Sequence, residues 1–310
     1  MGMNIIKLNN GVEIPQVGFG TYLIDKDNLP GILMNAYELG YRKFDTAWRY
    51  KNERIITDTF FKKNGIKRED VFITTKVNMA ALFLFGYHGG RDIIHKAANI
   101  RIRSVKQAIL ASFNNLKLEY VDLFLVHSAC PWYLEMYEEL TKLYKQGRIR
   151  AIGVSSFLPP HIESLKEVSD VVPAVNQFEI SPLNTQKDLI KYCFENDIVP
   201  EAMSTLSHFH SNEVRREIIE NGTIVNIAWK HEKSPAQVVW RWLYQQGISI
   251  IPKSRVLEHI KENISIFDFE LNDDEMTSID KLDGGKFLNY DIYPKLENLP
   301  EKYKDWKGFR

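Results

Sequence analysis

The stretch SVKQAILASFNNLKLEYVDLFLVHSACPWYLEMYEELTKLYKQGRIRAIGVSS, residues 104–156, decides the fold. Its apolar side chains follow a helical period over residues 104–116 and 132–145, and they form short apolar or β-branched runs over residues 120–127 and 150–155. Short runs of this kind are typical of strands buried on both faces, as in a parallel sheet. The stretch therefore predicts consecutive strand–helix units.

The same alternation extends over most of the chain. Further strand-like runs lie at residues 17–20, 43–47, 71–77, 174–180, 199–203 and 248–252, so that eight strands are predicted in all. Further helix-like stretches lie at residues 29–39, 53–63, 160–168, 185–195 and 234–244. Because parallel neighbours need a crossover between them, eight such units predict an α/β fold that closes into a (β/α)8 TIM barrel, with its active site at the carboxyl ends of the strands. An open doubly wound sheet is the alternative, but no GxGxxG follows the first strand.

An N-terminal segment precedes the first unit. Residues 5–17 carry short alternating runs around Asn10-Gly11, which predicts a β-hairpin. No low-complexity linker or change in composition divides the chain. Residues 1–310 are therefore predicted to form a single domain.

Two further segments fall outside the eight units. Residues 78–100 form an expanded loop after the third strand, and we expect its apolar part, residues 79–87, to fold over the barrel mouth as a lid. The tail at residues 286–310 is rich in aromatic side chains. It is expected to lie across the mouth, against the side of the barrel or against a second subunit.

The composition excludes several classes of partner. The chain has 40 basic and 40 acidic side chains and a formal net charge of +0, so no overall field would attract nucleic acid or an anionic membrane. Two cysteines, Cys130 and Cys193, form no disulfide framework and indicate a reducing compartment. The N-terminal MGMNIIKLNN is unlike a signal peptide, and the longest apolar run, residues 79–85, is too short to span a bilayer. A cytoplasmic protein is expected.

Polar residues stand at the carboxyl ends of three neighbouring predicted strands. Asp45 lies near the end of the second strand with Tyr50 five residues later, and Lys76 and His127 end the third and fourth. A lysine ammonium beside a phenol favours the phenolate, so we expect the pKa of Tyr50 to be lowered, while Asp45 keeps the lysine charged. Such a set is suited to protonating an oxygen while a hydride reaches the adjoining carbon.

With these residues in order, the chain resembles the aldo-keto reductase family over nearly its whole length. The motifs that carry the resemblance are GFGTY (18–22), YRKFDTAWRYKNE (41–53), ITTKV (73–77), YVDLFLVHSACP (120–131), IGVSSF (152–157), VNQFEISP (175–182) and IPKS…KENISIFDF (251–269). The resemblance implies an NADP(H)-dependent enzyme whose small-molecule substrate is an aldehyde or ketone, which it reduces to an alcohol. It assigns Tyr50 as general acid/base, Lys76 and Asp45 as the groups that tune it, and His127 as the group that orients the carbonyl.

The resemblance also implies the contacts of the cofactor. Ser155, Ser156 and Gln177 match positions that hold the nicotinamide carboxamide, and Met203 stands where the family usually stacks an aromatic ring. The other implied cofactor-binding residues are Gly20, Thr21, Tyr22, Ser204, Leu206, Ser207, Lys253, Ser254, Arg255, His259, Glu262 and Asn263.

The preference for NADPH rests on a few of these residues. Lys253 and Ser254 match the contacts to the 2′-phosphate, whereas His259 replaces the usual arginine. A histidine is a weaker, pH-dependent phosphate partner, and Arg255 is expected to substitute for the missing arginine. NADP(H) is the expected cofactor, with NADH as the alternative.

Trp48, Arg49 and Cys130 are the expected substrate residues. Arg49 precedes Tyr50, where the family commonly has a smaller apolar residue. We expect it to bind a substrate carboxylate or phosphate through a charge-assisted contact. The alternative is an ion pair with Glu53, in which case Arg49 never touches the substrate.

Other functions are open on the sequence alone. One is a cofactor-binding sensor or regulatory subunit with little turnover, and another is a Schiff-base lyase that uses Lys76 as nucleophile. No metal site is expected, since His88, His95, His208 and His210 lack a third ligand at metal-binding spacing. The oligomeric state is expected to be a monomer or a homodimer.

Overall fold

The computed structural model describes residues 4–77, 104–130, 132–206 and 212–286. The predicted loop at residues 78–100, almost all of the tail after residue 285, and Ser207 lie outside the described residues. The lid and the other features expected in those segments therefore stay predictions.

Eight parallel strands form one sheet in the order β10-β9-β8-β7-β6-β5-β4-β3. They are β3 (Gly18–Gly20), β4 (Lys43–Asp45), β5 (Phe72–Val77), β6 (Val121–Val126), β7 (Ile149–Ser155), β8 (Val175–Glu179), β9 (Val199–Met203) and β10 (Ser249–Ile250). A parallel bridge between Val17 and Ile250 joins the two edges. The Ile250 N–H donates to Gln16 O (2.8 Å) and the Gly20 N–H donates to Pro252 O (3.0 Å) across the same seam. The barrel prediction is confirmed, and the open sheet is wrong.

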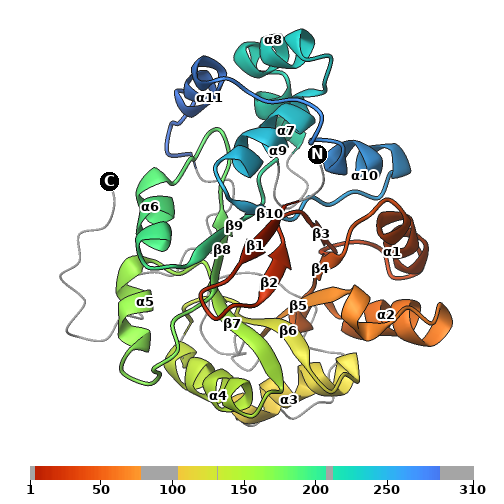
Figure 1. Cartoon of the computed structure of the whole chain (residues 1–310), viewed down its shortest axis with the longest axis vertical. Coiled ribbons are helices and arrows are strands. Elements are labelled where there is room, and N and C mark those ends of the chain that lie inside the picture. Colours follow the sequence, from red (N-terminus) through yellow and green to blue (C-terminus); the bar gives the residue numbers. More distant parts are fainter. Residues whose placement is uncertain (1–3, 78–103, 131, 207–211, 287–310) are drawn as a thin grey trace.

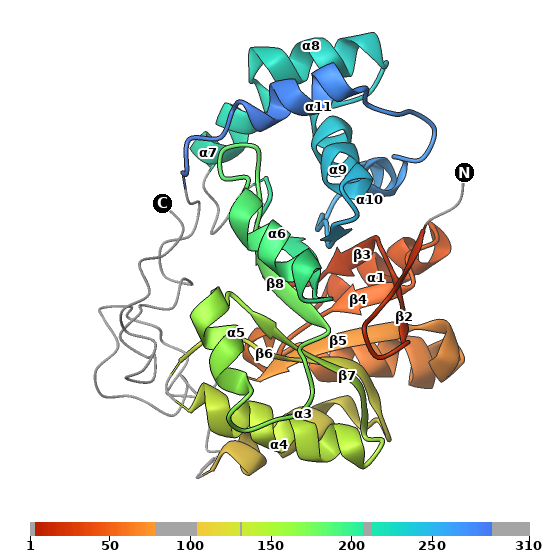
Figure 2. The same cartoon turned by 60° about the vertical axis from the view of Figure 1, so that its left-hand side comes forward.

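Helices surround the barrel (Figures 1 and 2). They are α1 (Leu29–Glu38), α2 (Glu53–Thr57), α3 (Val105–Leu116), α4 (Tyr133–Lys145), α5 (Pro159–Leu165), α6 (Lys187–Glu195), α7 (Asn212–Ile219), α8 (Gly222–Lys230), α9 (Pro235–Gln245), α10 (Leu257–Ile264) and α11 (Asp273–Asp280). Two begin at serine caps: Ser104 Oγ accepts from the Gln107 N–H and Ser234 Oγ from the Gln237 N–H. Helices α7, α8, α10 and α11 were not predicted from the sequence.

Three short turns of other helix types complete the described elements. They are η1 (Trp48–Tyr50), η2 (Asp58–Lys63) and η3 (Arg68–Asp70). The predicted helix at residues 53–63 is α-helical only as far as Thr57 and continues as the π-helical turn η2. The turn η1 carries Tyr50 and stands between β4 and α2, so it projects from the carboxyl end of a strand.

The amino ends of the strands are covered by the N-terminal hairpin. Strands β1 (Ile5–Lys7) and β2 (Glu13–Pro15) pair antiparallel, and Gly11 has the positive φ of +85° that the turn requires. Leu8 and Ile14 pack in one apolar cluster with residues that begin strands, among them Phe72. Figure 1 shows the hairpin over the centre of the ring of helices. The hairpin prediction is confirmed, and the opposite, carboxyl end carries the candidate site.

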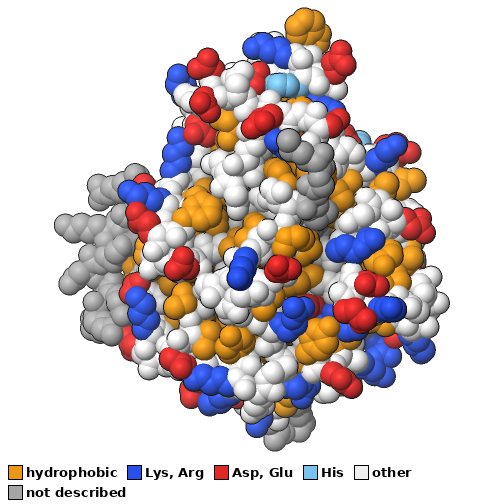
Figure 3. All heavy atoms as spheres, in the orientation of Figure 1, with side chains coloured by type: hydrophobic (Ala, Val, Ile, Leu, Met, Phe, Trp, Pro, Cys, Tyr) orange, Lys and Arg blue, Asp and Glu red, His pale blue; other side chains and the backbone are white. Residues whose placement is uncertain are grey.

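The surface matches the balanced composition. On the face seen in Figure 3, basic and acidic side chains are interspersed rather than segregated. Among the described helices, none combines the length and the apolar character needed to cross a bilayer. The cytoplasmic location, the single domain and the oligomeric state stay predictions.

Candidate active site

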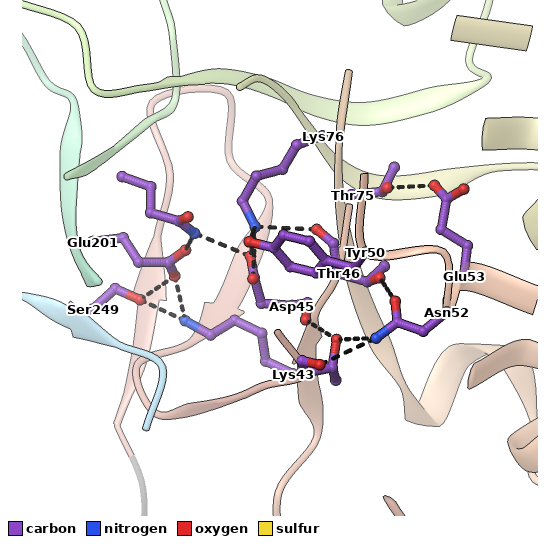
Figure 4. A network of polar contacts seen from close by, with 12 residues as sticks. Lys43, Asp45, Thr46, Tyr50, Asn52, Glu53, Thr75, Lys76, Glu201 and Ser249 are labelled. Carbon is purple, nitrogen blue, oxygen red and sulfur yellow. Dashed lines mark hydrogen bonds and ion pairs between the residues drawn. The ribbon is translucent and has the colours of Figure 1, made fainter. Parts of the chain in front are cut away.

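The mouth of the barrel is built around a buried lysine. Lys76, near the end of β5, is fully buried, and its Nζ donates to both oxygens of Asp45 at 2.6 Å and to Thr46 O at 3.1 Å. The same Nζ lies 3.4 Å from the Tyr50 hydroxyl. Figure 4 shows these side chains converging from β4, β5 and η1. The sequence therefore identified residues that lie together in space.

The protonation of Lys76 follows from these contacts. Burial alone would lower the pKa of Lys76, but the Asp45 carboxylate, and then Tyr50, raise it above the usual value. Lys76 is consequently an ammonium at neutral pH. It is held as a cation for electrostatic use rather than as a free amine.

The acidity of Tyr50 differs from the expectation. Burial raises the pKa of Tyr50 to about 12, and the Lys76 ammonium offsets only part of that increase. The prediction that the pKa of Tyr50 is lowered is wrong for this structure. The sequence indicated a lysine near the phenol, but it did not indicate how completely the hydroxyl would be removed from water. Tyr50 is therefore a protonated phenol at neutral pH.

His127 and Tyr22 flank the phenol. The imidazole ring of His127 lies edge-on to the Tyr50 ring, with centroids 5.9 Å apart, and the Tyr22 ring lies 4.7 Å from it on centroids. Burial, followed by the charges of Lys76 and Arg49, lowers the pKa of His127 well below its usual value. His127 is thus a neutral imidazole whose Nδ1 is buried without a partner among the described residues. A neutral ring here can act as a hydrogen-bond donor to an oxygen.

Three residues on neighbouring strands form a second polar group. Ser155 pairs in register with Gln177, and the Ser156 N–H donates to Gln177 O at 2.8 Å. The hydroxyls of Ser155 and Ser156 are buried and have no partner within the described part of the chain. Because buried hydroxyls are normally hydrogen-bonded, these two are ready to bind a ligand.

The residues that begin the barrel serve its framework. Thr21 Oγ1 donates to Asp45 O at 2.8 Å and accepts from Asn52 Nδ2 at 3.0 Å, and Thr46 Oγ1 donates to Asn52 Oδ1 at 2.5 Å. A Cβ on Gly20 would lie 3.0 Å from Ile251 O. This network fixes the loop that carries Tyr50.

The residues expected on the phosphate side lie beyond β10. Lys253 and Arg255 have exposed side chains. Partial removal of water from the Lys253 ammonium, followed by the charge of Arg255, lowers the pKa of Lys253, so the two cations lie near each other. Ser254 lies between them, and His259 and Glu262 lie in α10. This brings a cationic pair beside the start of a helix.

Asn263 differs from its neighbours in this segment. It is buried, and its Oδ1 accepts from Trp240 Nε1 at 2.9 Å. Its amide oxygen therefore serves the packing of α9 and α10. Its amide nitrogen is the group left for a ligand.

The expected substrate residues line the mouth to different degrees. Trp48 and Cys130 are half-buried, whereas Arg49 is exposed. Glu53 is buried and accepts from Thr75 Oγ1 at 2.6 Å and from Asn115 Nδ2 at 2.8 Å. Thr75 and Asn115 thus bind the two carboxylate oxygens of Glu53, which does not need Arg49 as a partner.

The remaining expected cofactor residues follow β9. Met203 and Ser204 are half-buried at the end of that strand, and Leu206 is half-buried just beyond it. The Thr205 hydroxyl between them is buried and has no partner in the described structure. Sequence reasoning missed Thr205, although a hydroxyl in this segment was a readable signal.

Sequence reasoning also missed a second buried ion pair. Lys43 Nζ donates to Glu201 Oε2 at 2.7 Å and to Ser249 Oγ at 2.5 Å, inside the barrel and next to Asp45 (Figure 4). The signal was a lysine two residues before Asp45 and a glutamate within a predicted buried strand. Among the described residues, no group of three or more His, Cys, Asp or Glu side chains is arranged to hold a metal ion.

Comparison with known proteins places this geometry in a family. A model of the Aldo/keto reductase family matches residues 16–284. The glyoxal reductase of Bacillus subtilis is 38% identical over 283 residues, covering 89% of this chain and 92% of that protein. The methylglyoxal reductase DkgA of Escherichia coli O157:H7 is 34% identical over 290 residues, covering 93% and 96%. A solved aldo-keto reductase complexed with NADPH is 32% identical, covers 93% of this chain and 90% of that one, and has a TM-score of 0.76. The chain belongs to the aldo/keto reductase family.

Proposed function

We propose that the chain is an NADP(H)-dependent oxidoreductase that reduces the carbonyl group of an aldehyde or ketone to an alcohol. The observation that carries the proposal is the distance of 3.4 Å between the Tyr50 hydroxyl and Lys76 Nζ. Lys76 Nζ is an ammonium that donates to both carboxylate oxygens of Asp45. His127 stands beside the same phenol. The site therefore brings together a phenol that can give up a proton, an ammonium that stabilises the resulting phenolate, and a neutral imidazole that can donate a hydrogen bond.

The proton is the contribution of Tyr50. With its pKa raised to about 12 by burial, the phenol stays protonated at neutral pH and can donate to a substrate oxygen. Lys76 stabilises the phenolate left behind, and neutral His127 donates a hydrogen bond to the same oxygen. Burial of Tyr50 thus keeps the phenol protonated, which is the form needed to reduce a carbonyl group.

The polar groups at the mouth support a nicotinamide cofactor. The buried hydroxyls of Ser155 and Ser156 are without partners among the described residues and, with Gln177, fit a carboxamide. Lys253 and Arg255 supply the cations that a phosphate needs. When bound, the reduced nicotinamide supplies the hydride. A relative solved with NADPH supports the phosphorylated form of the cofactor.

The relatives also support a substrate class. Two of them are a glyoxal reductase and a methylglyoxal reductase. We propose that small 2-oxoaldehydes are among the substrates of this chain. Their second carbonyl oxygen is a further acceptor that a polar mouth can bind.

The test is a panel of carbonyl substrates followed by nicotinamide absorbance, first with NADPH and then with NADH. Oxidation of NADPH by small 2-oxoaldehydes is the expected result. Tight NADP(H) binding without turnover over the panel would instead favour the sensor. Borohydride trapping of a substrate on Lys76 would favour the lyase, a chemistry that needs the free amine which Asp45 disfavours.

A further inference from the structure

A second ion pair lies in the barrel interior beside the catalytic one. Lys43 and Glu201 are 1% and 0% exposed, and Ser249 Oγ donates to Glu201 Oε2 at 2.7 Å while Lys43 Nζ donates to the same oxygen at 2.7 Å. The three side chains come from β4, β9 and β10 (Figure 4). A buried ion pair is weak evidence for stability, because removing two charges from water offsets their attraction. Its presence here calls for another role.

The backbone makes room for this pair. Gly18 pairs in register with Lys43 across β3 and β4, and a Cβ on Gly18 would lie 2.2 Å from Lys43 Cε. Lys43 stands two residues before Asp45, so both side chains point from β4 into the barrel. The glycine allows the lysine side chain to cross the interior toward Glu201.

The two oxygens of Glu201 are assigned to different neighbours. Oε2 accepts from Lys43 and Ser249, whereas Oε1 accepts from Gln177 Nε2 at 2.8 Å. Gln177 Nε2 also donates to Asp45 Oδ2 at 3.0 Å. Both neighbours of the Gln177 amide nitrogen are carboxylates, so the NH2 group must face them. Gln177 Oε1 is left as the acceptor, with no partner among the described residues.

We propose that Lys43 and Glu201 are positioning residues that fix the amide orientation of Gln177, so that its Oε1 accepts from the NH2 of a nicotinamide carboxamide. The inference rests on the proposed NADP(H) function. Neither Lys43 nor Glu201 touches the ligand in this account; both act through Gln177.

The charge of Glu201 is what makes this orientation definite. Although burial raises the pKa of Glu201, the Lys43 ammonium and the hydrogen bonds hold it below the usual value. An ionised Glu201 has acceptors only, whereas a neutral side chain would bring a donor to face Gln177. The other charged groups nearby, Asp45 and Lys76, already bind each other.

The first test is Glu201→Gln, which keeps the shape of the side chain. Lys43 and Ser249 both donate to one end of residue 201, so its new carbonyl oxygen stays there and its new NH2 faces Gln177 Nε2. Two donors then oppose each other, so Gln177 Nε2 keeps only Asp45 as an acceptor and the Gln177 amide shifts away from residue 201. We expect NADPH binding to weaken by about tenfold, the equivalent of one good hydrogen bond.

The second test is the double variant Lys43→Met with Glu201→Gln. Without the ammonium, the new amide can rotate, so that its oxygen accepts from Gln177 Nε2 and its NH2 donates to Ser249 Oγ. We expect NADPH affinity to return to within about twofold of the wild type, a non-additive result that couples the two residues. A purely structural role predicts no such rescue.

The readout is the dissociation constant measured by fluorescence titration with two ligands, NADPH and its 3-acetylpyridine analogue, which lacks the carboxamide NH2. The wild type should prefer NADPH by about tenfold, Glu201→Gln should lose that preference, and the double variant should regain it. Asp122→Asn is the matched control, since it also converts a buried carboxylate to an amide, but at the other end of the barrel. It should keep the preference.

The outcomes separate the two proposals. If the wild type prefers NADPH and a folded Glu201→Gln variant prefers it equally, the inference is overturned while the proposed function stands. If the wild type binds neither dinucleotide, the proposed function is overturned and the inference with it. Should Glu201→Gln not fold, the double variant Lys43→Met with Glu201→Leu serves in its place, since an apolar pair can replace a buried ion pair. It removes the acceptor of Gln177 Nε2 at residue 201, so an unchanged preference for NADPH overturns the inference.

Discussion

The two ends of the barrel each bury an aspartate and treat it differently. At the amino end, Asp122 accepts from Arg68 Nη2 at 2.5 Å, from Arg150 Nη1 at 2.8 Å and from the Ile73 N–H at 2.8 Å. Every one of these donors comes from the chain itself. The N-terminal hairpin then covers the amino ends of the strands, where Leu8 and Ile14 pack against residues such as Phe72.

At the carboxyl end, Asp45 is bound by Lys76 and Gln177, but the surrounding polar groups are left open. Several buried polar atoms there lack partners among the described residues, including Ser155 Oγ, Ser156 Oγ, His127 Nδ1 and Thr205 Oγ1, whereas beside Asp122 the corresponding atom is Arg68 Nε. Buried groups without partners are costly for folding alone. The difference indicates that one end of the barrel is built for stability and the other for a ligand.

The largest expected effect is on activity, from a substitution at the carboxyl end of the barrel that leaves the amino end unchanged. Tyr50→Phe keeps the ring and removes the hydroxyl that contacts Lys76, so kcat/KM for carbonyl reduction should fall by about 10³-fold. The free energy of unfolding in urea should change little, because the hydroxyl makes a single long contact of 3.4 Å. Turnover at the wild-type level would contradict the proposed role of Tyr50.

The converse variant is a substitution at the amino end, which should lower stability and leave catalysis at the carboxyl end unchanged. Asp122→Asn leaves Arg68 and Arg150 facing a neutral amide, so the free energy of unfolding should fall by about 3 kcal/mol. Steady-state kinetics at a temperature well below the unfolding transition should give an unchanged kcat. A large loss of kcat with unchanged stability would show that the two ends are not separated in the way we describe.

Much of the fold was readable because it rests on local patterns. Strands such as β5 and β6 are continuous buried runs, and helices such as α3 follow the helical period of their apolar residues. Helices α7, α8 and α11 were missed, since they fall between or after the strand–helix units on which the prediction was based, and α10, which follows the last strand, was missed as well. The closing bridge between Val17 and Ile250 joins residues from opposite ends of the chain. From the sequence, this contact follows only indirectly, because a parallel sheet of eight strands is expected to close into a barrel.

The site was readable where position on a strand decided it. Asp45, Lys76 and His127 were predictable because side chains at the carboxyl ends of parallel strands converge. The Lys43–Glu201 pair was not, because its partners stand 158 residues apart and each looks like an isolated charge. The acidity of Tyr50 was predicted with the wrong sign, since burial depends on everything packed around the ring.

A third buried carboxylate sharpens the comparison because it has no cation. Glu53 is held by neutral donors, and burial raises its pKa from the usual 4.5 to about 7. The folded state therefore holds a proton that the unfolded state releases, so this stabilisation is complete below pH 4.5 and is lost as the pH rises through 7. In Glu53→Gln, the fall in the free energy of unfolding between about pH 5 and pH 8 should be smaller by about 2 kcal/mol.

The measurement is urea unfolding of both proteins at a series of pH values. Histidines such as His127 and His161 titrate in both proteins, so their contribution cancels in the difference. Parallel stability curves for the two proteins would show that Glu53 is ionised in the folded state throughout. A difference of the expected sign would separate this carboxylate from Asp45 and Asp122, which are both paired with cationic side chains.

The smallest expected effect concerns the rim of the mouth. Arg49 is exposed beside Tyr50, and its charge contributes to lowering the pKa of His127, so it lies within electrostatic range of the reacting oxygen. If it binds a substrate anion, Arg49→Ala should lower kcat/KM about fivefold for aldehydes that carry a carboxylate or phosphate, because an exposed charge contact contributes about 1 kcal/mol. Neutral aldehydes of matched size should change less than about twofold. Arg49→Lys should recover part of the difference by restoring the charge without the bidentate geometry. Equal losses for charged and neutral aldehydes would remove Arg49 from substrate recognition and leave specificity to other residues of the mouth.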